Sequence, residues 1–374
     1  MINKLRLALR HELESDTRAF GSGWLSGVAA FVLALAGLFG VLGARYPQFF
    51  SMKELSVIYS FSGFTLALQI ILLAAFMLAC CNLVLRRNKM LGFTAIFIVL
   101  GASLLGATTA AQPNATSHLF GLDWFALNIL FTGLLFVPLE KLFGRLKEQA
   151  LFRTEWREDL FYFFLSSLLV QSLTYLSLAP SMAVLAHTSN WADFRAMVAS
   201  QPIWLQFIEV MFLTDFVQYW FHRAFHKIPF LWGFHAVHHS AKAMDWLAGS
   251  RMHIVEIIGL RGLTIIPMYS LGFSETALHA YILTVYVYAT YIHANLRFNV
   301  EFLKKYIVTP RFHHWHHGIE KEAIDVNFAI HFPLFDRLFG TYYMPEKVWP
   351  SGYGVGGYPV PNGYLSQLAY PFKR

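Results

Sequence analysis

The sequence of 374 residues has few charges and almost no cysteine. Asp, Glu, Lys and Arg make up 14% of it, whereas a soluble domain carries roughly a quarter. Cys80 and Cys81 are adjacent in an apolar stretch, so the chain has neither a disulfide framework nor a cysteine-based zinc finger. It also lacks a Cys-x-x-Cys-His haem-attachment motif. These absences exclude an ordinary soluble globule and a disulfide-stabilised scaffold.

Hydrophobic residues make up 56% of the chain and gather in long runs. A helix needs roughly 20 apolar residues to cross a bilayer. Four runs of this kind lie at 24–43, 61–85, 91–111 and 119–139, and further runs lie at 160–185, 203–221, 254–273 and 277–292. The last two are joined by a short turn and form either a hairpin or re-entrant segments. We predict an all-α, polytopic integral membrane protein with about six to eight apolar spans or hairpins.

The distribution of Lys and Arg predicts the orientation of these spans. Basic residues collect in the N-terminal arm, at 86–89 and at 141–157, and none lies between the third and fourth runs. Because positive loops stay on the cytoplasmic side, we expect a cytoplasmic N-terminus and a cytoplasmic region from His222 onward. The net charge of +7 then favours attraction to anionic lipid headgroups, and we expect no nucleic-acid partner.

Histidine is the abundant residue that this composition does not explain. Most of the 16 histidines fall within 215–342, in three clusters. The first is a pair four residues apart, and the other two repeat the spacing H-x-x-H-H, of which roughly 0.03 copies are expected by chance. The clusters are His222 and His226; His235, His238 and His239; and His313, His316 and His317.

Histidines at i, i+3 and i+4 project from one face of a helix and can converge on a metal ion. Eight or more imidazoles are too many for one ion and suit two ions that share a site. A helical, cytoplasmic, histidine-rich metal site is therefore predicted. Two alternatives remain open: histidines placed at the headgroup boundary as amphipathic side chains, and a metal transporter or sensor, which would place its ligands near the bilayer midplane.

The order of the clusters resembles the fatty acid hydroxylase / sterol desaturase superfamily of membrane di-iron oxygenases. Flanking residues strengthen the resemblance, namely Asp215 with Tyr219 and Trp220, the segment His293-Ala-Asn295-Leu296, and Asp336-Arg-Leu-Phe-Gly-Thr-Tyr342. The resemblance covers roughly 205–345. It does not extend to the first four apolar runs. Together with the apolar runs and the charges, it predicts a cytoplasmic N-terminal arm (1–22), an N-terminal transmembrane region (23–200), a hydroxylase/desaturase-like catalytic region (201–345) and an irregular C-terminal tail (346–374).

By this resemblance the eight clustered histidines and His293 are the expected metal ligands and catalytic residues. The family often has Arg-x-His-Pro-x-Glu after the second cluster, whereas this chain has Arg251-Met-His253-Ile-Val-Glu256. His253 therefore remains either a ligand or a residue that bonds one. We expect Asp215, Asn295 and Asp325 to accept hydrogen bonds from ligand imidazoles and so fix their orientation.

The implied chemistry is O2-dependent hydroxylation of an unactivated C–H bond in a lipid, such as a fatty acyl chain or a sterol. The implied cofactors are two iron ions, which zinc can replace in a purified sample. Electrons are expected from a separate cytochrome- or ferredoxin-type donor, and the substrate from the bilayer. Desaturation and ether-lipid oxidation at the same site remain open alternatives.

Overall fold

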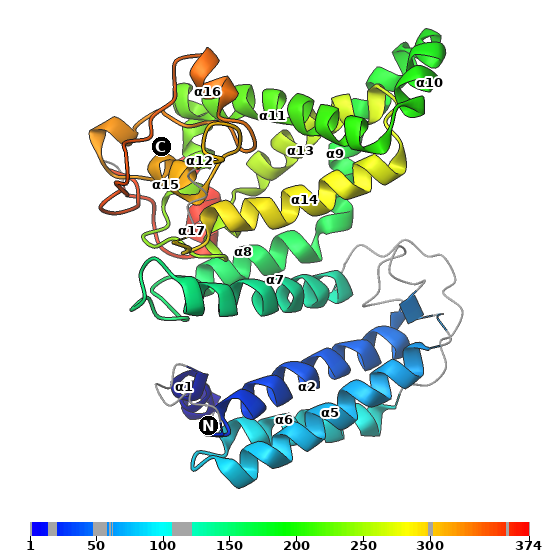
Figure 1. Cartoon of the computed structure of the whole chain (residues 1–374), viewed down its shortest axis with the longest axis vertical. Coiled ribbons are helices and arrows are strands. Elements are labelled where there is room, and N and C mark those ends of the chain that lie inside the picture. The colour runs from blue at the N-terminus through cyan, green and yellow to red at the C-terminus, as the bar shows by residue number, and fades with distance from the viewer. Residues whose placement is uncertain are drawn as a thin grey trace. The chain divides into compact units, whose positions relative to one another are not determined.

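The computed structural model of the chain describes residues 2–13, 21–47, 58–59, 61, 63–106, 122–297, 302–356 and 359–373. Within these residues the structure is all-helical, with two isolated backbone bridges and no strand, which confirms the predicted class (Figure 1). In chain order the α-helices are α1 (Ile2–Leu13), α2 (Trp24–Arg45), α5 (Phe64–Leu85), α6 (Met90–Leu105), α7 (Leu122–Phe143), α8 (Trp156–Leu168), α9 (Val170–His187), α10 (Ala192–Ser200), α11 (Ile203–Lys227), α12 (Pro229–His239), α13 (Ile254–Ser270), α14 (Glu275–His293), α15 (Pro310–His316), α16 (Leu334–Leu338) and α17 (Tyr364–Ala369).

The chain divides into two compact units. The first comprises Met1–Gly133, Ala150–Phe152 and Ser167–Gln171, and the second comprises Leu134–Gln149, Arg153–Ser166 and Ser172–Arg374. Every expected metal ligand belongs to the second unit.

In the first unit, α2, α5 and α6 pack through small side chains. Their shared core consists largely of alanines, which let helix backbones approach closely. Asn82 joins the three helices at one end, because its amide donates to the Gly23 carbonyl at 2.8 Å and accepts from the Gly92 N–H at 3.0 Å. Arg86 and Glu12 form a buried ion pair beside it.

In the described part of the chain, α2 and α5 are long and apolar enough to cross a membrane, and the bent pair α10–α11 gives a third candidate if it counts as one span. They correspond to the predicted runs at 24–43, 61–85 and 203–221. The run at 91–111 corresponds to α6, which has only 16 residues. A membrane protein fits these helices, and the count of six to eight spans stays a prediction.

The second unit is built around α11, which packs against α12, α13 and α14. Local sequence explains where its neighbours begin. Pro229 and Pro310 occupy the first turns of α12 and α15, where a missing N–H costs nothing. Ser274 and Thr309 cap α14 and α15 with side-chain oxygens that accept backbone N–H groups. The histidines lie at or near the C-terminal ends of α11, α12, α14 and α15.

The predicted irregular tail is 346–374, and its described residues (346–356 and 359–373) are irregular except for α17 and a following turn at Tyr370–Phe372. That turn packs on α12, where Pro371 lies against Gly233. Gln367 is buried and bonds Tyr162 and Glu158. The end of the described chain thus braces the helix that carries the second histidine cluster.

Candidate metal centre

Four helix ends bring nine histidines together. His222 and His226 lie in the last two turns of α11, the second cluster ends α12, His293 ends α14, and the third cluster ends α15 with His317 as its C-cap. The helical spacing predicted from the sequence is therefore present in all three clusters. Eight of these residues are buried, and the side chain of the ninth, His226, is only 5% exposed.

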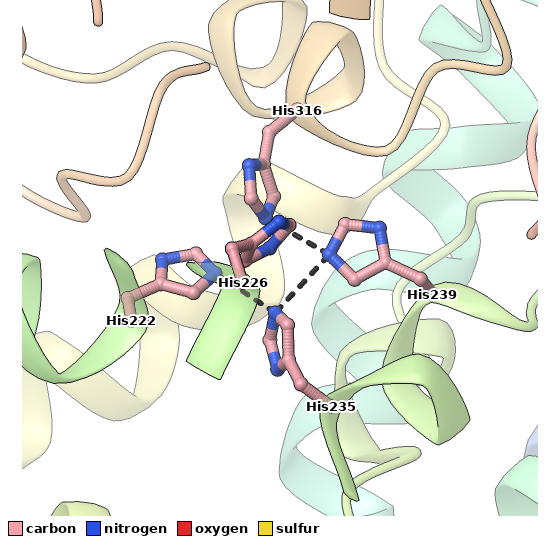
Figure 2. Close-up of side chains that lie close together, drawn as sticks. All are labelled: His222, His226, His235, His239 and His316. Atoms are coloured by element: carbon pink, nitrogen blue, oxygen red, sulfur yellow. Dashed lines mark hydrogen bonds between the residues drawn. The ribbon is translucent and has the colours of Figure 1, made fainter. Parts of the chain in front are cut away.

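The nine histidines form two groups, in each of which one ring nitrogen per residue lies within 4.8 Å of the others. The five-histidine group draws on three helices, as Figure 2 shows. The four-histidine group combines one residue of α12 with the ends of α14 and α15. The members are His222, His226, His235, His239 and His316 in the first group, and His238, His293, His313 and His317 in the second.

Six of these imidazoles are oriented through Nδ1. Four donate Nδ1–H to backbone carbonyls: His222 to Phe328 (2.8 Å), His238 to Arg251 (2.9 Å), His293 to Ala289 (2.6 Å) and His316 to Val326 (2.8 Å). Two face carboxylates: His235 with Glu256 (2.5 Å) and His226 with Asp325 (3.3 Å). A carbonyl oxygen can only accept, so the proton resides on Nδ1 and the Nε2 lone pair is left for another partner.

The Nε2 atoms face one another. Six Nε2–Nε2 distances fall between 2.9 and 3.3 Å, for example His222–His235 at 2.9 Å and His293–His313 at 2.9 Å. Two lone pairs this close repel unless a proton or cation lies between them. Two nitrogen ligands that each lie about 2.1 Å from the same ion, with a right angle between the two bonds, would be about 3.0 Å apart. The Nε2 of His226 is buried without a hydrogen-bond partner among the described residues. The donor set therefore fits metal ions.

Burial keeps these rings neutral, which is the form that binds metal. Removal from water lowers the pKa of His235 and His238 to about 3. The same cause, with neighbouring imidazoles second, holds the pKa of His239 and His316 well below its usual range. A proton would therefore not compete with a cation at these nitrogens near neutral pH.

Asp215 contributes to the site differently from the prediction. Its carboxylate accepts the backbone N–H groups of Ile330, His331 and Phe332 at 2.8–3.0 Å, so its partners are backbone donors rather than an imidazole. Asp336 likewise accepts from the N–H groups of Phe328 and Ala329. The two carboxylates hold the segment 326–332, which we call the carbonyl segment.

The carbonyl segment supplies two of the oxygens that orient the five-histidine group. The Phe328 carbonyl receives His222 Nδ1–H and the Val326 carbonyl receives His316 Nδ1–H. Asp215 thus orients His222 and His316 indirectly, because it anchors the carbonyl segment whose oxygens accept their Nδ1–H groups.

Asp325 and Asn295, which were both expected to bond ligand imidazoles, have different kinds of partner in the structure. Asp325 pairs with His226 and also with Lys227, as expected of a residue that bonds a candidate ligand. Asn295 instead exchanges hydrogen bonds with the backbone of Leu146, and its own N–H donates to Glu140. It therefore fixes the chain after His293 rather than an imidazole.

Two features of the site were missed by the sequence reasoning. Glu256 bonds His235, and its position at the end of the Arg251-x-His253-x-x-Glu256 motif was the signal that could have suggested a role. A buried network of ion pairs also holds Arg251, whose carbonyl orients His238. Its members are Arg153, Glu155, Asp159, Asp245 and Arg251.

His253 lies outside both histidine groups. It caps α13, where its Nδ1 accepts the Val255 N–H at 3.2 Å, and its Nε2 donates to the Leu368 carbonyl at 3.1 Å. Both ring nitrogens are thus engaged elsewhere.

We expect His253→Asn to keep the full metal content of the protein, because asparagine caps helices well and no group loses a ligand. Metal quantification per chain checks this, with His235→Asn as the matched variant that loses metal. Loss of metal in His253→Asn equal to that in His235→Asn would make His253 a ligand after all.

His314, which lies within the third cluster, is also outside both groups. Its Nδ1 contacts the Tyr353 hydroxyl at 2.8 Å and its Nε2 the His293 carbonyl at 3.2 Å. It therefore packs behind the four-histidine group.

Residues 207–341 match the fatty acid hydroxylase family. The chain is 27% identical over 285 residues to an ornithine lipid hydroxylase of Rhizobium tropici, a match that covers 74% of this chain and 82% of that protein. It is 26% identical over 175 residues to an alkylglycerol monooxygenase of Caenorhabditis elegans, covering 47% and 34% of the two chains. It is 32% identical over 145 residues to an alkylglycerol monooxygenase of Xenopus tropicalis, a match that covers 38% of this chain and 31% of that protein. The chain thus spans about a third of these two monooxygenases. No solved structure matches it.

Proposed function

We propose that the chain, whose residues 207–341 match the fatty acid hydroxylase family, is a membrane-bound di-iron oxygenase that hydroxylates a lipid. The observation that carries this proposal is the pair of buried histidine groups whose Nε2 lone pairs converge. The match over 82% of an ornithine lipid hydroxylase favours a lipid that carries both a polar headgroup and acyl chains.

The five-histidine group and the four-histidine group would each hold one iron ion. When bound, the two ions supply reductive activation of O2, which allows oxidation of a C–H bond that no side-chain acid or base could attack. Nine neutral imidazoles add no negative charge, so Glu256 and Asp325 are the carboxylates that balance charge at the rings they contact. Both contact rings of the five-histidine group.

The protein's own contribution is orientation and exclusion of water. Backbone carbonyls and carboxylates fix the imidazoles before any ion arrives, so little reorganisation accompanies binding. All nine rings are buried, which keeps bulk water from the reacting centre.

We further propose a multi-pass membrane protein with its N-terminus and metal centre on the cytoplasmic side, following the distribution of Lys and Arg. Electrons would come from a separate one-electron donor protein that meets this side. A metal transporter is less well supported, since the histidines cluster at helix ends and not midway along a span.

Lipid extracts from cells with and without the chain test the proposal. Hydroxylation predicts a lipid heavier by one oxygen, which takes up the heavy isotope from 18O2 and vanishes in a His238→Ala variant. A product lighter by two hydrogens would indicate a desaturase instead. Identical lipid profiles with and without the chain would contradict an oxygenase.

A further inference from the structure

A short exposed helix precedes α11 at a sharp bend. The directions of α10 and α11 differ by 117° across Gln201 and Pro202. Figure 1 shows α10 at the end of α11 that lies away from α12. Proline at the break removes a backbone donor and favours an extended residue before it, so a continuous helix is prevented here.

The bend is fixed by a buried glutamine. The Gln206 side chain, 1% exposed, donates to the carbonyls of Ala199 and Gln201 at the end of α10. Its carbonyl oxygen accepts the N–H of Ser274, the residue that caps α14. One side chain therefore ties together the end of α10, the first turn of α11 and the start of α14. The angle is thus built into the fold.

Among the residues that the structure describes, only one side of α10 makes contacts. Val198 is buried in a core cluster with Val210 and Met268. Arg195 bonds the Thr188 carbonyl and lies against Gly272, where a side chain would collide with it. Gly272 also has φ +86°, which only glycine adopts readily.

The remaining surface of α10 carries an apolar stripe and, directly beside it, a polar one. Phe194 and Met197, which are 43% and 57% exposed, are three residues apart and form one stripe. Asp193 and Ser200 are seven residues apart and form another exposed stripe. Two exposed tryptophans flank the helix: Trp191, whose ring contacts Phe194, and Trp204.

Tryptophan and phenylalanine on a short amphipathic helix are typical of the boundary between headgroups and acyl chains. If α11 crosses the membrane, α10 departs from the membrane plane by only roughly 30°. The length of α11 fits as well. His222 follows Ile203 by 19 residues, which at 1.5 Å per residue is about 28 Å, close to the roughly 30 Å of the hydrocarbon layer.

We propose that α10 is an interfacial helix that lies in the headgroup layer of the membrane face opposite the histidine groups, with Phe194 and Met197 toward the acyl chains. It sets the depth of α11, so that the histidines at the other end of that helix reach the opposite headgroup layer. This inference rests on the membrane placement within the proposed function and is independent of the reaction catalysed.

Fluorescent labels on the full-length chain in lipid nanodiscs test it. In a background with both cysteines replaced by serine, single cysteines are placed by Phe194→Cys and Met197→Cys. The matched controls are Ala192→Cys and Ala199→Cys, which are exposed positions on the opposite side of the same helix. Labels at the first two positions should be quenched by nitroxides near the lipid headgroup. Aqueous iodide should quench the labels at Phe194 and Met197 several-fold more weakly than it quenches the labels at the control positions.

Three results would overturn the proposal: iodide quenching equal to the controls, protection from iodide without quenching by lipid nitroxides, or strongest quenching by nitroxides deep in the bilayer. The first would place α10 in water, the second under protein and the third within the hydrocarbon. Metal content and lipid product are measured on the same samples, so an intact enzyme with labels in water rejects the helix placement alone.

A second measurement needs no substitution. A diazirine carried on a lipid headgroup, photolysed with the unmodified protein, should form adducts on Phe194 and Met197. Adducts confined to α11 would contradict the proposal.

Discussion

Replacing both His239 and His316 with alanine is expected to remove one of two bound metal ions and to abolish lipid oxidation. Both residues belong to the five-histidine group, where their Nε2 atoms lie 3.0 Å apart. The variant leaves that group with three imidazoles and leaves the four-histidine group whole. Metal quantification per chain and the oxidised lipid product are measured on the same preparation.

The control for this prediction is another buried histidine. His331 is 1% exposed, lies outside both groups and contacts the Tyr281 hydroxyl. His331→Ala should keep two ions per chain, which separates loss of a ligand from loss of a buried ring. The double variant keeping two ions, or the control losing them equally, would contradict the assignment of ligands.

Asp215→Ala is expected to destabilise the protein and loosen the five-histidine group. The substitution leaves the N–H groups of Ile330, His331 and Phe332 without their acceptor. A buried unsatisfied donor costs about 1–3 kcal/mol, so a loss of about 3 kcal/mol or more is expected. Because the carbonyl segment orients His222 and His316, metal affinity of that group should fall by about 10–100-fold.

Equilibrium unfolding in detergent measures the first effect, and competition with a chelator measures the second. Asp215→Asn is the matched variant, since its amide oxygen can still accept from Ile330 and His331 while the contact with Phe332 is lost. Its effect should be smaller on both readouts. Wild-type stability and metal retention in Asp215→Ala would show that the carbonyl segment holds its shape without this anchor.

The sequence predicted the histidines that converge because their spacing repeats the geometry of a helix. His235, His238 and His239 lie at i, i+3 and i+4, and that periodicity already places them on one face. The division into five and four could not be predicted in this way. It depends on how α11, α12, α14 and α15 pack together. His235 and His239 belong to the five-histidine group, whereas His238, from the same helix, belongs to the four-histidine group.

The residues that orient the histidines were harder to predict, because several of them act through the backbone. Asp215 is 115 residues from the N–H of Ile330 that it binds, and a backbone donor has no signature in the sequence. The same holds for the carbonyls of Phe328 and Arg251. The motif around Arg251 drew attention to His253, whereas Glu256, one turn further on, is the residue that reaches His235.

The membrane spans were predicted with uneven success for a related reason. Hydropathy identifies α2 and α5 directly. The helices of the second unit mix apolar residues with the polar groups that build the site, as in α11 with Gln206 and Asp215. Composition alone therefore cannot separate a span from a buried helix there.

The central claim is that nine histidines form a two-ion centre. Native mass spectrometry of the intact chain, purified without oxygen after growth with iron, tests it most directly by counting the ions on each molecule. Two ions per chain are predicted, with iron replaced by zinc at the same count in aerobic preparations. A single ion, or none, at saturating metal would contradict the account.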